Sequence, residues 1–249
     1  MPLKTVAVIA GLVRRCAVVA LACAPVYAGP ASGQSIAPRK DTGKCVGIIS
    51  AIGDTVAVAK TGFTVFNNEN FKVPIDAWRI DDLVFSKISS VLGRRSNLKR
   101  ISVPQGSFAV LEEGYRPFSD PAEEARAILA KVITAPRCDR YIVVMKIRMA
   151  LKTGQRVDGL GLSFQGNQYY ASAAFSLNVY DGQNFALLEK HQALTGEKNF
   201  LGRRLVPGRE VDKTWWPTAN GTLGPAARDG FRSFVLESLE ATVPELSNS

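Results

Sequence analysis

The chain has 249 residues, with 31 Lys plus Arg, 22 Asp plus Glu and one His, so its formal net charge is +9. Hydrophobic residues make up 46% of it, enough to bury a sizeable core, which excludes a globally disordered chain. Four cysteines in this length are too few for a disulfide-dense mini-protein.

The first 28 residues have the pattern of an export signal. Basic residues precede an unbroken apolar run, and Val26 and Ala28 then stand at the positions that a signal peptidase reads. We therefore expect cleavage after Ala28 and a periplasmic or secreted protein. The alternatives are a retained membrane anchor and a lipoprotein attached at Cys23. Against the anchor, Arg14 and Arg15 divide the segment into apolar runs of about nine residues, whereas a span needs roughly 20.

Cleavage at that position leaves 221 residues with 28 basic and 22 acidic groups, a net charge of +6. Cys45 and Cys138 are then the only cysteines, and an oxidising compartment favours a disulfide between them. Free buried thiols and half of a metal site are the alternatives. Because a zinc site would need His191 and carboxylates as further ligands, we expect no metal and no cofactor. Export also argues against a nucleic-acid partner.

The exported part is expected to form a single domain over 44–249. Residues 29–43 contain Gly, Pro, Ser, Gln and Lys and almost no large apolar side chains, which predicts a flexible lead-in. Short β-rich runs then alternate with turn residues and predict a meander of strands. These strands are expected at 46–51, 55–59, 63–66 and 71–75.

Two amphipathic helices follow, separated by a strand at 98–103. Apolar residues spaced by three and four predict the first helix up to Leu92, with Asp76 as its N-cap and its acidic pair, Asp81 and Asp82, on the solvent side. The second helix is predicted by Asp120 as N-cap and Pro121 at the first helical position, and it ends before Pro136.

The second half of the chain predicts mainly strands. Alternating apolar residues favour strands at 141–151, 169–180 and 185–194, of which the last two form an antiparallel hairpin. We expect a glycine-rich connection over 154–166, a long loop over 196–224 and a closing helix over 226–242. The fold class is therefore α+β, or α/β, as a two-layer sandwich of about three helices on a mainly antiparallel or mixed sheet.

Signatures of catalysis are missing from the sequence. The string from Gly161 to Gln165 lacks the second glycine of a serine-hydrolase elbow, and neither a P-loop nor a dinucleotide-binding motif occurs. His191 lies in a predicted strand with no nucleophile motif beside it. We therefore expect a protein that is not an enzyme. The alternative is an envelope hydrolase whose site is assembled from distant residues around His191 or Ser163.

Two basic segments are candidates for partner binding. The first places four positive charges in seven residues, and the second precedes a tandem tryptophan within the 196–224 loop. Such segments suit contact with a polyanion or a protein partner. Their other interpretation is a solvated loop and aromatic rings that cover a sheet edge. The candidate residues are Arg94, Arg95, Lys99, Arg100, Arg203, Arg204, Trp215 and Trp216.

The order of elements resembles that of bacterial envelope proteins. An amphipathic helix over 78–92, a strand led by residues 138–144 and a strand with a Tyr-Asp-Gly turn over 175–182 are similar in architecture to the curli-secretion lipoprotein family and the amino-terminal domain of TolB. The lipobox and transmembrane hairpins of the curli family are not found here. The resemblance implies an envelope location and no functional residue. We expect a binding or assembly module for an envelope protein or an anionic envelope component, touching the membrane only at its surface.

Overall fold

The computed structural model describes residues 45–61, 68–93, 97–111, 120–134, 138–150, 156–193 and 208–246. All of these residues belong to one compact unit that runs from Lys40 to Ser249. The expected signal at 1–28, the lead-in at 29–43 and the strand at 63–66 lie outside them.

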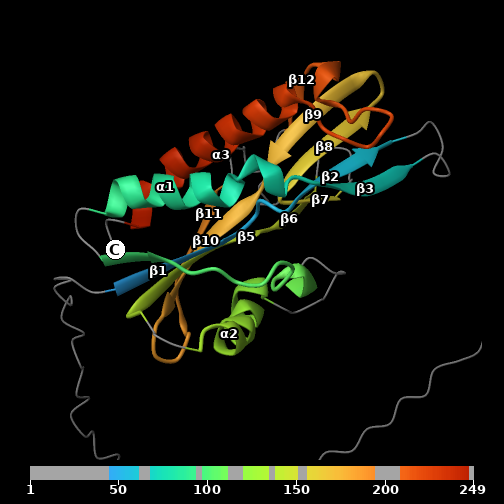
Figure 1. Cartoon of the computed structure of the whole chain (residues 1–249). Helices are drawn as coiled ribbons and strands as arrows, with labels where there is room; N and C mark the ends of the chain where they lie inside the picture. The colour runs from blue at the N-terminus through green and yellow to red at the C-terminus, as the bar shows by residue number, and fades with distance from the viewer. Residues whose placement is uncertain are drawn as a thin grey trace, which may run out of the picture. The chain divides into compact units, whose positions relative to one another are not determined.

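The described residues form two five-stranded mixed sheets and three α-helices, which confirms the α+β class (Figure 1). The first sheet has the order β11-β10-β5-β1-β4. Its strands are β1 (Cys45–Ala51), β4 (Asn97–Arg100), β5 (Arg140–Lys146), β10 (Phe175–Asp181) and β11 (Leu187–Ala193). The second sheet has the order β12-β9-β8-β2-β3. Its strands are β2 (Thr55–Lys60), β3 (Glu69–Pro74), β8 (Leu160–Gln165), β9 (Gln168–Ala173) and β12 (Arg209–Val211).

The two sheets continue into each other. β1 leads into β2 after a short bend, and β9 leads into β10 through Ala174 (Figure 1). At this junction Ala174 accepts a hydrogen bond from the N–H of Ile147 at 3.1 Å and donates one to the carbonyl of Gly159 at 2.9 Å. Between β5 and β8 the chain forms a small hairpin of β6 (Arg148–Ala150) and β7 (Arg156–Asp158).

The prediction of a glycine-rich connection over 154–166 was wrong, because β7 and β8 lie there. In β8, Leu160 and Leu162 point into the core, while Gly161 and Ser163 alternate with them and are also buried. Strand prediction depends on the alternation of apolar and polar residues. The small residues on the second face of β8 obscured that alternation.

Helices cover both faces of the first sheet. α1 (Ile80–Leu92) and α3 (Pro225–Leu246) pack on one face, and α2 (Pro121–Val132) packs on the other (Figure 1). Under α1 and α3, the larger core includes Ile52, Leu162, Phe175 and Phe231. Under α2, the smaller core includes Leu129, Tyr141 and Val143. The expected layer of helices is thus confirmed for α1 and α3, with α2 added on the far side.

The start of α2 agrees with its sequence, whereas the start of α1 does not. Asp120 caps α2 by accepting the N–H of Ala122 at 2.9 Å. Asp76, expected as the cap of α1, instead begins a 3-10 turn (Asp76–Trp78). Arg79 then takes left-handed backbone angles, φ 54° and ψ 42°, and α1 begins after it. The chain therefore changes direction through two consecutive turns before α1. The N-cap pattern used to predict helix starts does not detect such turns.

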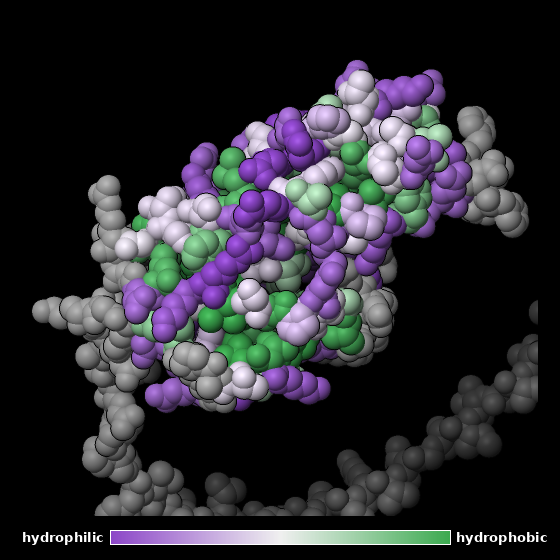
Figure 2. All heavy atoms as spheres, viewed as in Figure 1, coloured by the Kyte–Doolittle hydropathy of each residue, from purple (hydrophilic) through white to green (hydrophobic). Residues whose placement is uncertain are grey.

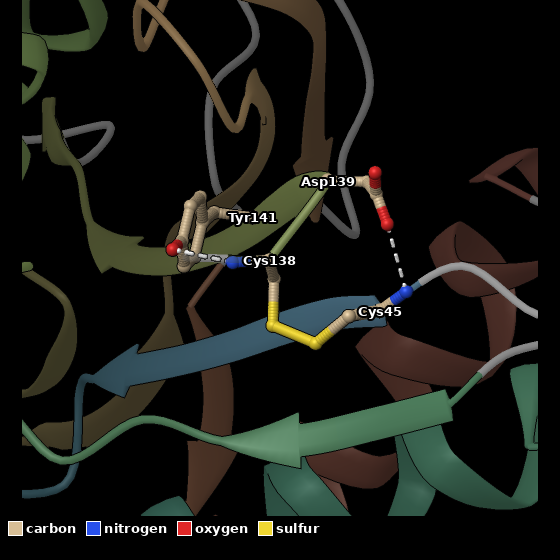
Figure 3. Close-up of a disulfide and its surroundings, with 4 residues drawn as sticks. All are labelled: Cys45, Cys138, Asp139 and Tyr141. Carbon is tan, nitrogen blue, oxygen red and sulfur yellow. Dashed lines mark hydrogen bonds between the residues drawn. A yellow bond between two sulfur atoms is a disulfide. The ribbon is translucent and has the colours of Figure 1, made fainter. Parts of the chain in front are cut away.

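A disulfide joins Cys45 to Cys138, as expected. It links the first residue of β1 to the segment that leads into β5, the neighbouring parallel strand (Figure 3). Two hydrogen bonds flank the bridge: Cys45 N–H donates to Asp139 Oδ2 at 3.0 Å, and Cys138 N–H donates to the Tyr141 hydroxyl at 2.9 Å. The bridge and these bonds fix the start of the first sheet.

In the part of the chain that the structure describes, no helix combines the length and the apolar character needed to cross a membrane.

Candidate partner-binding face

β4 is the terminal strand of the first sheet and has one open edge. Ile101, directly after β4, donates its N–H to the carbonyl of Ile48 on β1 at 2.9 Å. Backbone groups of successive strand residues point to opposite sides, so the N–H and C=O groups of Leu98 and Arg100 point away from β1. Among the described residues no strand pairs with that side of β4.

Cationic side chains border this open edge. Lys99 is exposed and forms no ion pair with any described residue. Arg100 pairs with Asp82 of α1, which also accepts a hydrogen bond from Arg79. The hydrogen bonds from Arg100 and Arg79 lower the pKa of Asp82, so this carboxylate stays charged. The two candidate cations thus lie at the edge, one unpaired and one shared with α1.

A groove of about 400 Å³ runs from β4 to the end of α2. Its aliphatic part comes from Ile101, Val132 and Ile133, and its cationic part comes from Lys99 and Arg100. On the face seen in Figure 2, hydrophilic residues form an oblique band from β4 toward the start of α1, and apolar residues gather below it over α2. The open edge therefore adjoins a groove that offers both charge and apolar surface.

Four of the other candidate residues lie outside the described residues: Arg94, Arg95, Arg203 and Arg204. Of the 196–224 loop, the structure describes residues from 208 onward, which include β12 and the 3-10 turn η4 (Lys213–Trp215). The structure thus places Lys99 and Arg100 together and leaves the remaining arginines unassigned.

The tandem tryptophans are packed apart from each other. The ring of Trp215 lies 5.6 Å from the rings of both Phe231 and Phe234 on α3. The ring of Trp216 lies 5.4 Å from that of Tyr169 on β9. Both indoles are half-buried and pack against the larger core. They hold the segment before α3 against helix and sheet, in line with the second interpretation made from the sequence, and they lie apart from the β4 edge.

Acidic side chains converge below α1, at a place that the sequence did not indicate. The expectation that Asp81 faces solvent was wrong: its carboxylate accepts hydrogen bonds from the Ser50 hydroxyl and the Ile52 N–H. Two cavities, of about 200 and 140 Å³, share Ser50 and Asp81, and Asp54 and Asp76 also line the larger one. Burial raises the pKa of Asp81. Asp81 and Asp82 are neighbours on α1, but the Asp82 carboxylate pairs with Arg79 and Arg100 whereas the Asp81 carboxylate points inward.

The residues of the hydrolase alternative do not come together. Ser163 lies on β8 of the second sheet and accepts a hydrogen bond from Gln165 at 3.3 Å. His191 lies on β11 of the first sheet, with Glu189 Oε2 at 3.1 Å from its Nε2. Among the described residues, no three His, Cys, Asp or Glu side chains are placed to bind a metal ion together.

Comparison with known proteins adds no relative. No protein-family model and no curated protein matches this chain. Lys99 and Arg100 of this face were expected from the sequence, whereas the groove residues Val132 and Ile133 of α2 and its end were not.

Proposed function

We propose that this protein is a non-enzymatic binding module of the cell envelope, and that it captures a partner protein by pairing an extended acidic segment with the open edge of β4. The observation that carries the proposal is the row of outward backbone groups at Leu98 and Arg100, which has no partner among the described residues. Strand addition uses such groups for affinity and the neighbouring side-chain pockets for specificity.

The charges of the edge favour an acidic partner. Lys99 has no ion pair within the described residues, and Arg100 shares its carboxylate with Arg79. A second copy of the same edge would bring like charges together, which is how proteins discourage pairing between edges. An added strand with acidic residues on the α1 side instead gains an opposite charge at Arg100, whereas Lys99 points to the other face of the sheet.

The groove beside the edge favours a protein segment over a bare anion. A strand laid along β4 places alternate side chains toward α2, where Ile101, Val132 and Ile133 offer aliphatic surface. The export pattern of the sequence and the Cys45–Cys138 disulfide support an oxidising location. The fitting partner is thus an exported protein with an extended segment that alternates acidic and aliphatic residues.

The test uses two labelled peptides of alternating sequence, one of Val and Glu and one of Val and Lys, with binding read by fluorescence anisotropy. We expect only the Val-Glu peptide to bind. Arg100→Glu, on the face that the glutamates of the peptide occupy, is expected to weaken binding about tenfold, or about 1.4 kcal/mol, and Lys213→Glu, in the 3-10 turn η4, serves as the matched control. Equal binding of both peptides, or equal effects of both variants, would contradict the proposal.

A second pair of variants separates backbone pairing from charge. Arg100→Gln removes the charge and keeps the N–H, whereas Arg100→Pro also removes the outward N–H. We expect Arg100→Pro to bind more weakly than Arg100→Gln, with both variants checked for folding by thermal melting. In hydrogen exchange, the amides of Leu98 and Arg100 should gain protection on peptide binding while that of Lys99 stays unchanged. Protection of Lys99 alone would exclude strand addition.

A further inference from the structure

A groove between α1 and α3 holds an excess of arginine side chains that strand pairing does not use. Its volume is about 450 Å³, within the ~300–1,000 Å³ range of small-molecule sites. Arg79 lines it from the start of α1, and Arg228 and Arg232, one turn apart on α3, line it from the other side.

The arginines outnumber the carboxylates that neutralise them. Asp82 pairs with both Arg79 and Arg100, and Asp229 pairs with Arg228 at 2.8 Å. Arg232 donates to a neutral partner, the carbonyl of Trp78, at 2.7 Å. Three guanidinium groups and two carboxylates line the groove. With Arg100, which lies outside the groove and shares Asp82, the cluster has four guanidinium groups for two carboxylates, an excess of two positive charges.

The guanidinium groups also retain unused donors. Each arginine carries five N–H donors in a planar fork, and the hydrogen bonds of Arg79, Arg228 and Arg232 use only part of them. The side chain of Arg79 is 77% exposed, and that of Arg228 is 47% exposed. These two forks are therefore accessible to a ligand that enters the groove.

The backbone at Arg79 is strained at this position. Its φ of 54° lies in the left-handed region that glycine adopts far more readily than arginine. Strain of this kind concentrates at binding sites, where the surrounding structure holds a residue in place for its side chain. The turn before α1 thus holds Arg79 in the lining of the groove.

We propose that this groove binds a phosphate monoester group. Such a group carries a charge of about −1.5 to −2 near pH 7, which is opposite in sign and similar in size to the excess of the arginine cluster that includes Arg100. Guanidinium forks bind its oxygens in bidentate fashion. The ester can belong to a soluble metabolite or to a lipid headgroup. The proposal is separate from strand addition at β4, since it concerns the groove between α1 and α3 and a different class of ligand, with Asp82 in contact with both places.

The experiment measures binding calorimetrically with three probes: glycerol 3-phosphate in solution, phosphatidylcholine vesicles containing phosphatidic acid, and vesicles containing phosphatidylglycerol, a diester. Arg79→Gly removes one guanidinium group and relieves the strained backbone, and Arg228→Gln removes another. Arg126→Gln, on α2, is the matched control, because that residue is also an exposed arginine with a single carbonyl partner.

Either phosphate monoester is expected to bind, and the two groove variants should each weaken it about tenfold while the control leaves it unchanged. Binding of glycerol 3-phosphate assigns the site to a soluble ligand, and binding of phosphatidic acid vesicles alone assigns it to a membrane lipid. The inference is overturned if neither monoester binds, if the diester vesicles bind equally well, or if the control weakens binding as much as the groove variants. Thermal melting checks that each variant is folded. If Arg228→Gln does not fold, Arg79→Gly alone provides the comparison with the control.

Discussion

The hydroxyl of Ser50 on β1 donates a hydrogen bond to the carboxylate of Asp81, in the first turn of α1, at 2.5 Å. The same carboxylate accepts the N–H of Ile52 at 3.1 Å and that of Gly53. The Asp81 side chain therefore connects the bend between β1 and β2 to the start of α1, next to Arg79 of the groove between α1 and α3.

The Asp81 carboxyl makes stability depend on pH in a defined direction. Burial is the largest influence and raises its pKa above the ordinary 3.8, despite the hydrogen bonds that lower it. The folded state then holds this proton to higher pH than the unfolded state, so the contribution of Asp81 to stability is largest below pH 3.8 and is lost as pH rises through the folded pKa.

Asp81→Asn removes that titration. In urea unfolding at a series of pH values, we expect the free energy of unfolding of the wild type to fall relative to the variant as pH rises above 3.8, and the difference then to become constant. Asp82→Asn, whose carboxyl has a lowered pKa, should show the opposite slope. A flat difference for Asp81→Asn would refute the buried, titrating carboxyl.

Gly230 and Trp215 form a pair whose substitutions should depend on each other. A Cβ atom at Gly230 would lie 1.7 Å from the ring of Trp215, so Gly230→Ala forces the indole to move. We expect a loss of about 1–3 kcal/mol in the wild type. In a Trp215→Ala background the same change should become stabilising by about 0.5–1 kcal/mol, because alanine is the better helix former.

Trp216→Ala provides the control background, since its ring contacts Tyr169 and Phe164 on the sheet. There Gly230→Ala should remain destabilising. Additive effects in both backgrounds, measured by chemical denaturation, would show that the helix does not pack on Trp215.

Arg79 and Phe185 both have positive φ, 54° and 55°, but glycine should be well tolerated only in place of Arg79. Arg79→Gly is expected to be more stable than Arg79→Ala by about 1 kcal/mol, because only glycine lacks the Cβ that the left-handed conformation crowds. Phe185→Gly is expected to lose about 3–5 kcal/mol, because the ring is buried against Tyr141. Thermal melting of the variants gives the comparison, and equal stability of the two Arg79 variants would count against strain at that turn.

The Cys45–Cys138 bridge closes a loop across 93 positions, and the chain-entropy model assigns such a loop about 4.6 kcal/mol as an upper figure. The Cys45→Ser/Cys138→Ser double variant should therefore unfold at clearly lower denaturant concentration. In the wild type, alkylation under denaturing conditions should leave both cysteines unmodified until a reductant is added, as read by peptide mass spectrometry. Modification without reductant would exclude the bridge.

Local patterns predicted the elements whose determinants lie within a few residues. The cap of Asp120 on α2, the hairpin of β10 and β11 and the apolar stripe of α1 all depend on short spacings, and each is confirmed. Prediction failed where a distant contact decides the environment. β8 was missed because its second face, with Gly161 and Ser163, is buried, and Asp81 was placed in solvent because its partner, Ser50, lies 31 residues away.

The same division applies to the candidate sites. From the sequence alone come an α+β chain with a pattern for export, two cysteines suited to pairing, and Lys99 and Arg100 as basic candidates, because charge, composition and period are properties of neighbouring residues. Only the tertiary structure shows that Arg100 lies on an open strand edge beside a groove, and that Arg232 meets the turn at Trp78 across 154 residues of chain. These sites depend on the order of the strands in the first sheet and on the packing of α3 against α1. Contacts between residues far apart in the sequence decide both.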